Sequence, residues 1–147
     1  MLPPDGLAIL AAKDAIFLGA VGMPDIPDTV TLWGLLIPIR RAFEQYINLR
    51  PARALPGVKS PVSGGNAMDL MIVRENNEGE YSEIGGRVFR GFESEMALQE
   101  GVLSRKGVDR VARFAAELAL TRNGKVTSAV KSNGILHTMP FWDEVVG

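Results

Sequence analysis

Residues 68–81 read Met-Asp-Leu-Met-Ile-Val-Arg-Glu-Asn-Asn-Glu-Gly-Glu-Tyr. The apolar run 68–73 predicts a strand that ends at Arg74. From Gly79 to Gly91 four glycines surround an apolar and aromatic pattern, which predicts a projecting hairpin. In open α/β sheets ligands bind just beyond the carboxyl ends of strands, so this stretch indicates both a sheet and a site at its end.

The neighbouring segments alternate between helix and strand patterns. Helices are predicted over 5–13 with Asp5 as N-cap, over 29–46 with a kink at Pro38, over 108–119, and from a capping Thr138 onward. The third of these helices is expected to close at Asn123-Gly124. Extended segments are predicted at 14–19 (a buried strand), 48–55 and 125–130. This alternation predicts an α/β fold whose sheet has parallel character.

Composition excludes several classes of function. The 147 residues carry 16 basic and 17 acidic side chains, and this balance argues against a nucleic-acid or anionic membrane surface. The absence of cysteine excludes disulfides, thiolate zinc sites and a cysteine nucleophile. His137 is the single histidine, and we expect it to order a loop or a helix start. No apolar run is long enough to span a membrane, and no signal peptide is visible, so we expect a cytoplasmic protein.

Four cations stand at or near the ends of the predicted elements. Arg74 and Lys131 end strands, Arg50 lies in an extended run, and Arg40 lies late in the kinked helix. Arginine suits carboxylates because its planar fork donates two parallel hydrogen bonds. Two guanidinium charges about 6 Å apart repel by roughly 3 kcal/mol at an effective dielectric of about 20. Arginines that converge on one pocket therefore indicate a multiply charged anion.

Each of these residues also has a purely structural interpretation. Arg40 and Arg41 fit a solvated pair at a helix end, and Arg74 with Glu75 fits a surface ion pair. Lys131 fits an ordinary surface lysine. Tyr81 is a candidate acid or base, or an aromatic residue packed on a partner. The acidic residues of this region lack the spacing of a calcium loop and are interpreted as a solvated face; they are Glu75, Glu78, Glu80 and Glu83.

The ordered motifs together resemble one enzyme family over the whole chain. They are Asp14-Ala-Ile-Phe-Leu-Gly-Ala-Val-Gly22, Leu32-Trp-Gly-Leu-Leu36, Asn48-Leu-Arg-Pro51, Val73-Arg-Glu-Asn76 with Gly79-Glu-Tyr81, Ser104-Arg-Lys-Gly-Val108 and Lys131-Ser-Asn-Gly134. The chain resembles the NAD-dependent β-decarboxylating dehydrogenases, which include isocitrate, isopropylmalate and tartrate/D-malate enzymes. Residues 32–40 and 137–142 are most similar to the tartrate/D-malate branch.

The resemblance implies a role for each candidate residue. Arg40, Arg50 and Arg74 resemble three arginines that bind the carboxylates of a 2-hydroxy diacid. Tyr81 resembles the acid that protonates the enol after carbon dioxide leaves, and Lys131 the lysine that assists removal of the hydroxyl proton in the neighbouring subunit's site. Asn133 is similar to a residue near the nicotinamide of the cofactor.

The resemblance also implies cofactors, a partner and an architecture. It implies NAD, Mg²⁺ or Mn²⁺ with ligands outside this chain, and a homodimer joined through the arm at 79–91. The implied fold is the isocitrate/isopropylmalate dehydrogenase-like open sheet, present in part. Residues 1–46 would be the remnant of a first, cofactor-side domain, and 47–147 an incomplete central domain for substrate binding and dimerisation.

The expected function follows with its alternatives. We expect a segment of an oxidoreductase that oxidises D-malate or tartrate with NAD and decarboxylates the oxo acid, and we expect this chain alone to be inactive. The alternatives are a fragment of an isopropylmalate- or isocitrate-type enzyme, a non-catalytic dimerisation module, and a poorly folded remnant with exposed sheet edges.

Overall fold

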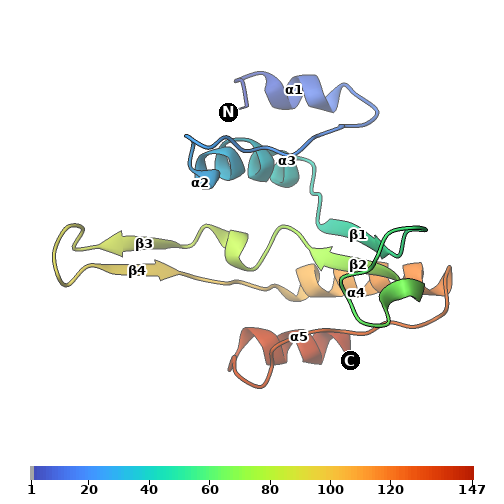
Figure 1. The fold of residues 1–147 in the computed structure, drawn as a ribbon. Coiled ribbons are helices and arrows are strands. Elements are labelled where there is room, and N and C mark those ends of the chain that lie inside the picture. The colour runs from blue at the N-terminus through green and yellow to red at the C-terminus, as the bar shows by residue number, and fades with distance from the viewer. Residues whose placement is uncertain (1) are drawn as a thin grey trace. The chain divides into compact units, whose positions relative to one another are not determined.

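The computed structural model describes residues 2–147, and the chain divides into two compact units, Met1–Gln45 and Tyr46–Gly147 (Figure 1). The first unit is helical, and the second combines helices with two pairs of strands. No helix among the described residues is long and apolar enough to cross a membrane.

The helical run of the first unit accommodates a proline by changing its hydrogen-bond pattern. It consists of α2 (Asp28–Thr31), the π-helical turn η1 (Leu32–Leu36) and α3 (Ile37–Ala42), and it follows the short helix α1 (Gly6–Ala11). In a regular α-helix the carbonyl of Gly34 would accept from residue 38, but Pro38 has no N–H. The N–H of Leu2 donates to that carbonyl instead, at 2.9 Å.

One prediction for the first unit is partly right and another is wrong. The first helix forms, but the side chain of Asp5 makes no capping hydrogen bond to it. The predicted buried strand at 14–19 is wrong, because these residues have no ladder partner among the described residues and the side chain of Phe17 is fully exposed. An apolar run becomes a strand only when a neighbouring strand satisfies its backbone.

The second unit contains the elements that carry most of the candidate residues. Its strands and helices, in chain order, are β1 (Ile47–Arg53), η2 (Gly65–Ala67), β2 (Asp69–Glu75), η3 (Glu80–Ser82), β3 (Gly85–Val88), β4 (Met96–Gln99), α4 (Arg105–Leu120) and α5 (Thr138–Val146). The predicted extended segments at 48–55 and 68–73 are therefore confirmed as β1 and β2.

Both strand pairs of the second unit are antiparallel. In the first pair Asn48 lies opposite Arg74 and Arg50 lies opposite Ile72. In the second pair Gly85 lies opposite Gln99. The predicted parallel character is wrong for the described residues, since alternation of helices and strands leaves the direction of each pair open.

The predicted hairpin forms, although it lies further along the chain than expected. Strands β3 and β4 are exposed along their whole length, and Figure 1 shows them as a two-stranded extension joined by a loop. The residues near 79–82 form a bonded loop and the turn η3 rather than the first strand of the hairpin.

Helix α4 supplies the apolar core of the second unit and packs against β2. Val108 and Val111 are buried on its inner face, as the helical periodicity predicts. Ser104 is the N-cap, and its side chain accepts from the N–H of Gly107. After the helix Gly124 adopts φ +71° and its N–H donates to the carbonyl of Ala119, which confirms the predicted glycine closure.

The segment after α4 differs from its prediction. Residues 125–130 form no strand, because they have no ladder partner among the described residues. Helix α5 confirms the predicted final helix, but Thr138 is its first residue and His137 occupies the N-cap position without a side-chain cap. Helix α5 packs against α4, where Arg105 pairs with Glu144 and lies over the ring of Phe141.

A charged contact joins the start of β2 to the end of α4. The carboxylate of Asp69 lies 3.0 Å from the guanidinium of Arg122 and 3.7 Å from that of Arg53. The hydrogen bond from Arg122 lowers the pKa of Asp69, and the charges of both arginines act in the same direction. The folded state therefore holds this proton less tightly than the unfolded chain does.

The variant Arg122→Gln should raise the pKa of Asp69 toward its ordinary value. The folded-state pKa of Asp69 in the parent chain is lowered. The ionised Asp69 carboxylate therefore contributes to the free energy of unfolding above its unfolded-state pKa, and this contribution is lost as the pH falls through the folded-state pKa. A carbon-detected NMR titration of Asp69, with acid unfolding followed in parallel, measures both effects.

Arg113→Gln is the matched control, because Arg113 lowers the pKa of Asp109 within α4 and does not contact Asp69. An Asp69 titration that is identical in the parent chain and in Arg122→Gln would contradict the assignment.

Candidate functional site

Two of the predicted arginines lie on one face of the β1–β2 pair. Asn48 and Arg50 are two residues apart on β1, and Arg74 lies directly opposite Asn48 on β2. Side chains at such positions point to the same face of a sheet. Arg50 Nε donates to Asn48 Oδ1 at 3.1 Å, and Asn48 Nδ2 donates to Asn76 Oδ1 at 3.3 Å. Asn48 therefore links Arg50 on β1 to Asn76 in the loop after β2.

The structure brings Arg74 and Tyr81 together. Arg74 Nη2 donates to the phenolic oxygen of Tyr81 at 3.4 Å, and the guanidinium carbon lies 5.5 Å from the centre of the Tyr81 ring. Both side chains are half-buried. In this hydrogen bond the guanidinium of Arg74 is the donor and the phenolic oxygen of Tyr81 is the acceptor.

Neither arginine of this face is neutralised by a carboxylate. Across residues 2–147 no ion pair involves Arg50 or Arg74. The alternative of an Arg74–Glu75 surface pair is wrong, because the carboxylate of Glu75 lies 3.6 Å from Arg110 instead. Two cations on one face without a carboxylate favour a bound anion.

The loop between β2 and Tyr81 is fixed by its own acidic residues. The carboxylate of Glu75 accepts from the N–H groups of Asn77 and Glu78 at 2.9 and 2.7 Å. Asn76 is buried, and its N–H donates to the carbonyl of Tyr46. The interpretation of Glu75 and Glu78 as a solvated face is wrong, whereas Glu80 and Glu83 are exposed.

Sequence reasoning missed the roles of Glu75 and Glu78 as acceptors. The sequence does contain one signal for Glu75. A carboxylate can accept from the backbone N–H groups two and three residues later when these lie in a glycine-containing turn. The contact with Arg110 has no such local signal, because Arg110 lies far along the chain.

Arg40 lies in the first unit, in the last turn of α3 beside Arg41. The guanidinium of Arg41 lies 5.5 Å from the ring centre of Trp33. Arg40 is half-buried and its Nη1 atom is fully buried, so the interpretation as a solvated pair is wrong for Arg40.

Lys131 and Asn133 lie in the segment between α4 and α5, and both side chains are exposed. In the described part of the chain neither side chain makes a hydrogen bond or an ion pair. The structure therefore does not bring either residue to Tyr81.

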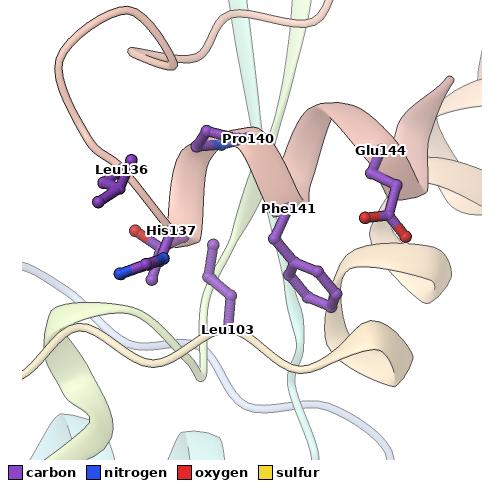
Figure 2. A pocket seen from close by; sticks show the side chains of 7 residues that line it. Leu103, Leu136, His137, Pro140, Phe141 and Glu144 are labelled. Atoms are coloured by element: carbon purple, nitrogen blue, oxygen red, sulfur yellow. The ribbon is translucent and has the colours of Figure 1, made fainter.

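A cavity of about 490 Å³ lies at the start of α5, away from these residues. Figure 2 shows His137, Phe141 and Glu144 along the helix, with Leu103 between the first two in this view. The cavity is open to solvent and is lined by both polar and apolar side chains, and none of the predicted site residues lines it. Within residues 2–147 no group of three His, Asp or Glu side chains is placed to hold a metal ion.

Comparisons with known proteins identify the relatives of this chain. The family model described as isocitrate/isopropylmalate dehydrogenase matches residues 1–147. A probable tartrate dehydrogenase/decarboxylase of Bacillus subtilis is 55% identical over 146 residues, which are 99% of this chain and 41% of that protein. The D-malate dehydrogenase (decarboxylating) of Escherichia coli is 53% identical over 150 residues, covering 99% of this chain and 42% of that protein.

A solved structure shows the same fold. The crystal structure of isocitrate dehydrogenase from Methylococcus capsulatus superposes with a TM-score of 0.84 at 28% identity, over 99% of this chain and 41% of that one. The chain thus spans about two fifths of the length of the relatives it matches. The match runs through both units and includes the strands that carry Arg50 and Arg74. The chain therefore belongs to the isocitrate/isopropylmalate dehydrogenase family.

Proposed function

We propose that this chain is the substrate-binding part of an NAD-dependent enzyme that oxidises D-malate or tartrate and decarboxylates the resulting oxo acid. The observation that carries the proposal is the pair Arg50 and Arg74 on one sheet face, without a carboxylate partner in the described chain, with Arg74 in contact with Tyr81. The names of the relatives from Bacillus subtilis and Escherichia coli support the choice of substrate.

The proposed binding step uses the guanidinium groups. Arg50 and Arg74 each offer a planar fork of N–H donors to a carboxylate of the diacid. Arg40 is proposed as the third guanidinium that binds the diacid. Residues 1–46 are proposed to belong to the cofactor-side domain and residues 47–147 to the central domain. A dianion offsets the mutual repulsion of the arginines, so a monoacid should bind much more weakly.

The proposed proton transfers use Tyr81 and Lys131. After carbon dioxide leaves, the Tyr81 hydroxyl gives its proton to the substrate carbon, and the guanidinium of Arg74 stabilises the phenolate that remains. Lys131, through its exposed ammonium group, takes part in removing the hydroxyl proton in the site of a partner subunit. Asn133 contributes an amide near the nicotinamide.

The cofactors fit this chain only in part. When bound, NAD would supply the hydride acceptor for the hydroxyl-bearing carbon of the substrate, and Asn133 would lie near its nicotinamide. The described residues do not fit a divalent metal by themselves, since no group of three ligands is present among them.

Arg74→Gln should weaken the binding of D-malate to the 147-residue chain by roughly ten- to a hundredfold, as expected for the loss of charge-assisted hydrogen bonds. Isothermal titration calorimetry measures the affinity. Arg87→Gln is the control, because it removes the same charge from the hairpin, where Arg87 pairs with Glu95.

The same titrations separate the alternatives. Tighter binding of isopropylmalate or isocitrate than of D-malate and tartrate would assign the other substrate type. A dimeric, folded chain that binds none of these diacids would favour the non-catalytic dimerisation module.

The 147-residue chain alone should not reduce NAD when D-malate and Mn²⁺ are supplied, because it spans only about two fifths of the length of the dehydrogenases that it matches. Absorbance of NADH measures the reaction, with the full-length relative from Escherichia coli as the positive control. Sustained NADH formation by the pure chain would contradict this expectation.

We propose that the hairpin β3–β4 joins two copies of the protein. Apolar side chains of the hairpin are more than half exposed, which is costly in water unless a partner covers them; they include Phe89, Phe92, Met96 and Leu98. A second hairpin with the same residues is a self-complementary partner.

Leu98→Glu together with Phe92→Glu should convert the dimer into a monomer, because each places a charge in the apolar surface of the hairpin. Sedimentation velocity measures the state. Leu120→Glu is the control, since this side chain is also exposed but lies at the end of α4. A parent chain that is already monomeric, or a dimer that survives the double substitution, would contradict the proposal.

A further inference from the structure

The start of helix α4 is capped by a carboxylate from outside the helix. The N–H of Ser104 donates to Glu78 Oε2 at 2.8 Å, and the Ser104 hydroxyl donates to Glu78 Oε1 at 2.6 Å while it accepts from the N–H of Gly107 at 2.9 Å. In a capping box the residue three positions after the N-cap supplies this carboxylate. Here that position is Gly107, and Glu78 supplies the carboxylate instead.

Gly107 leaves the space that Glu78 occupies. A Cβ atom at residue 107 would lie 2.2–2.4 Å from the carboxylate atoms of Glu78, which is closer than such atoms approach. Gly107 does not need its conformational freedom, since it lies in the first turn of a regular helix. Alanine would stabilise the helix itself, so the glycine serves the approach of Glu78.

The backbone between Glu78 and Tyr81 is held by hydrogen bonds. Gly79 has φ +71° and ψ −133°, a conformation that favours glycine, and its N–H donates to the carbonyl of Val102 at 2.8 Å. The turn η3, which contains Tyr81, begins at the next residue, and the N–H of Ser82 donates to the carbonyl of Gly79. A displacement of Glu78 is therefore passed on to Tyr81.

A second connection holds the other end of the same loop on α4. The guanidinium of Arg110 lies 3.6 Å from the Glu75 carboxylate and 4.6 Å from the ring centre of Tyr46. Residues 107 and 110 lie on one face of the helix, because they are three positions apart. Helix α4 thus holds the loop on both sides of Asn76 and Asn77.

We propose that Glu78 is a positioning residue, which fixes Tyr81 against Arg74 by fastening their loop to the N-terminus of α4 through Ser104, with Gly107 giving it access. The catalytic meaning of this position rests on the proposed function of Arg74 and Tyr81. The placement itself is independent of that function and can be measured without substrate.

The test uses the 147-residue chain with both tyrosines replaced by 3-fluorotyrosine, so that fluorine NMR reports Tyr81 and Tyr46 separately. Tyr46→Phe assigns the two resonances, and an added fluorinated compound is the chemical-shift reference. In Gly107→Ala and in Glu78→Ala the Tyr81 resonance should shift toward its position in the urea-unfolded chain. Glu78→Gln should restore most of the parent position, because glutamine also serves in capping boxes. Glu144→Ala is the control, since Glu144 pairs with Arg105 in the same first turn but belongs to α5.

Urea unfolding of each variant separates positioning from plain stabilisation. Gly107→Ala should unfold at a urea concentration close to that of the parent, because the higher helix propensity of alanine offsets the lost contact of Glu78, while its Tyr81 resonance moves. A role in helix stability alone does not produce this outcome. An unchanged Tyr81 resonance in both Gly107→Ala and Glu78→Ala would overturn the proposal, as would an equal shift in Glu144→Ala.

Calorimetry with D-malate completes the test. Weaker binding in Gly107→Ala than in the parent supports a link from Glu78 to the diacid site. If the parent itself binds no diacid, the proposed function fails, while the fluorine spectra still decide whether Glu78 positions Tyr81.

Discussion

The free N–H groups at the start of helix α4 need acceptors, and the way in which they are satisfied organises residues 46–147. The acceptor comes from the loop after β2, so the end of the strand that carries Arg74 is drawn to the end of the helix. Further contacts of α4 then fix the start of β2 through Asp69 and the helix α5 through Glu144. The buried face of α4 with Val108 and Val111 supplies apolar stabilisation, and the polar contacts connect both ends of the helix to the elements around it.

Local periodicity was sufficient for the elements whose partners lie within the chain. The stripe on α4 and the apolar run of β2 were predicted correctly, because each pattern matches one face of a helix or strand packed on the other. The runs at 14–19 and 125–130 carry equally good strand patterns but have no ladder partner among the described residues. A pattern of apolar residues indicates which face of a segment can be buried. It does not indicate which other segment packs against that face.

The candidate site shows the same division between residue type and placement. Arginine chemistry predicts a multiply charged anion, and the resemblance assigns the three arginines, but only the antiparallel register shows that Arg50 and Arg74 share a face. Glu75 and Glu78 could not be distinguished from solvated acidic residues by composition, because their partners are backbone N–H groups and side chains of α4.

Pro38 affects where the N-terminal residues bind to the helical run of the first unit. Its missing proton leaves the carbonyl of Gly34 as a docking point, and the amide of Leu2 occupies it. Any other residue at 38 would bring its own amide to that carbonyl, and the chain's beginning would then compete with the helix for one lone pair. The position of the first residues thus depends on the N–H group that Pro38 lacks. A mutation at residue 38 would therefore affect the N-terminal segment without contacting it directly.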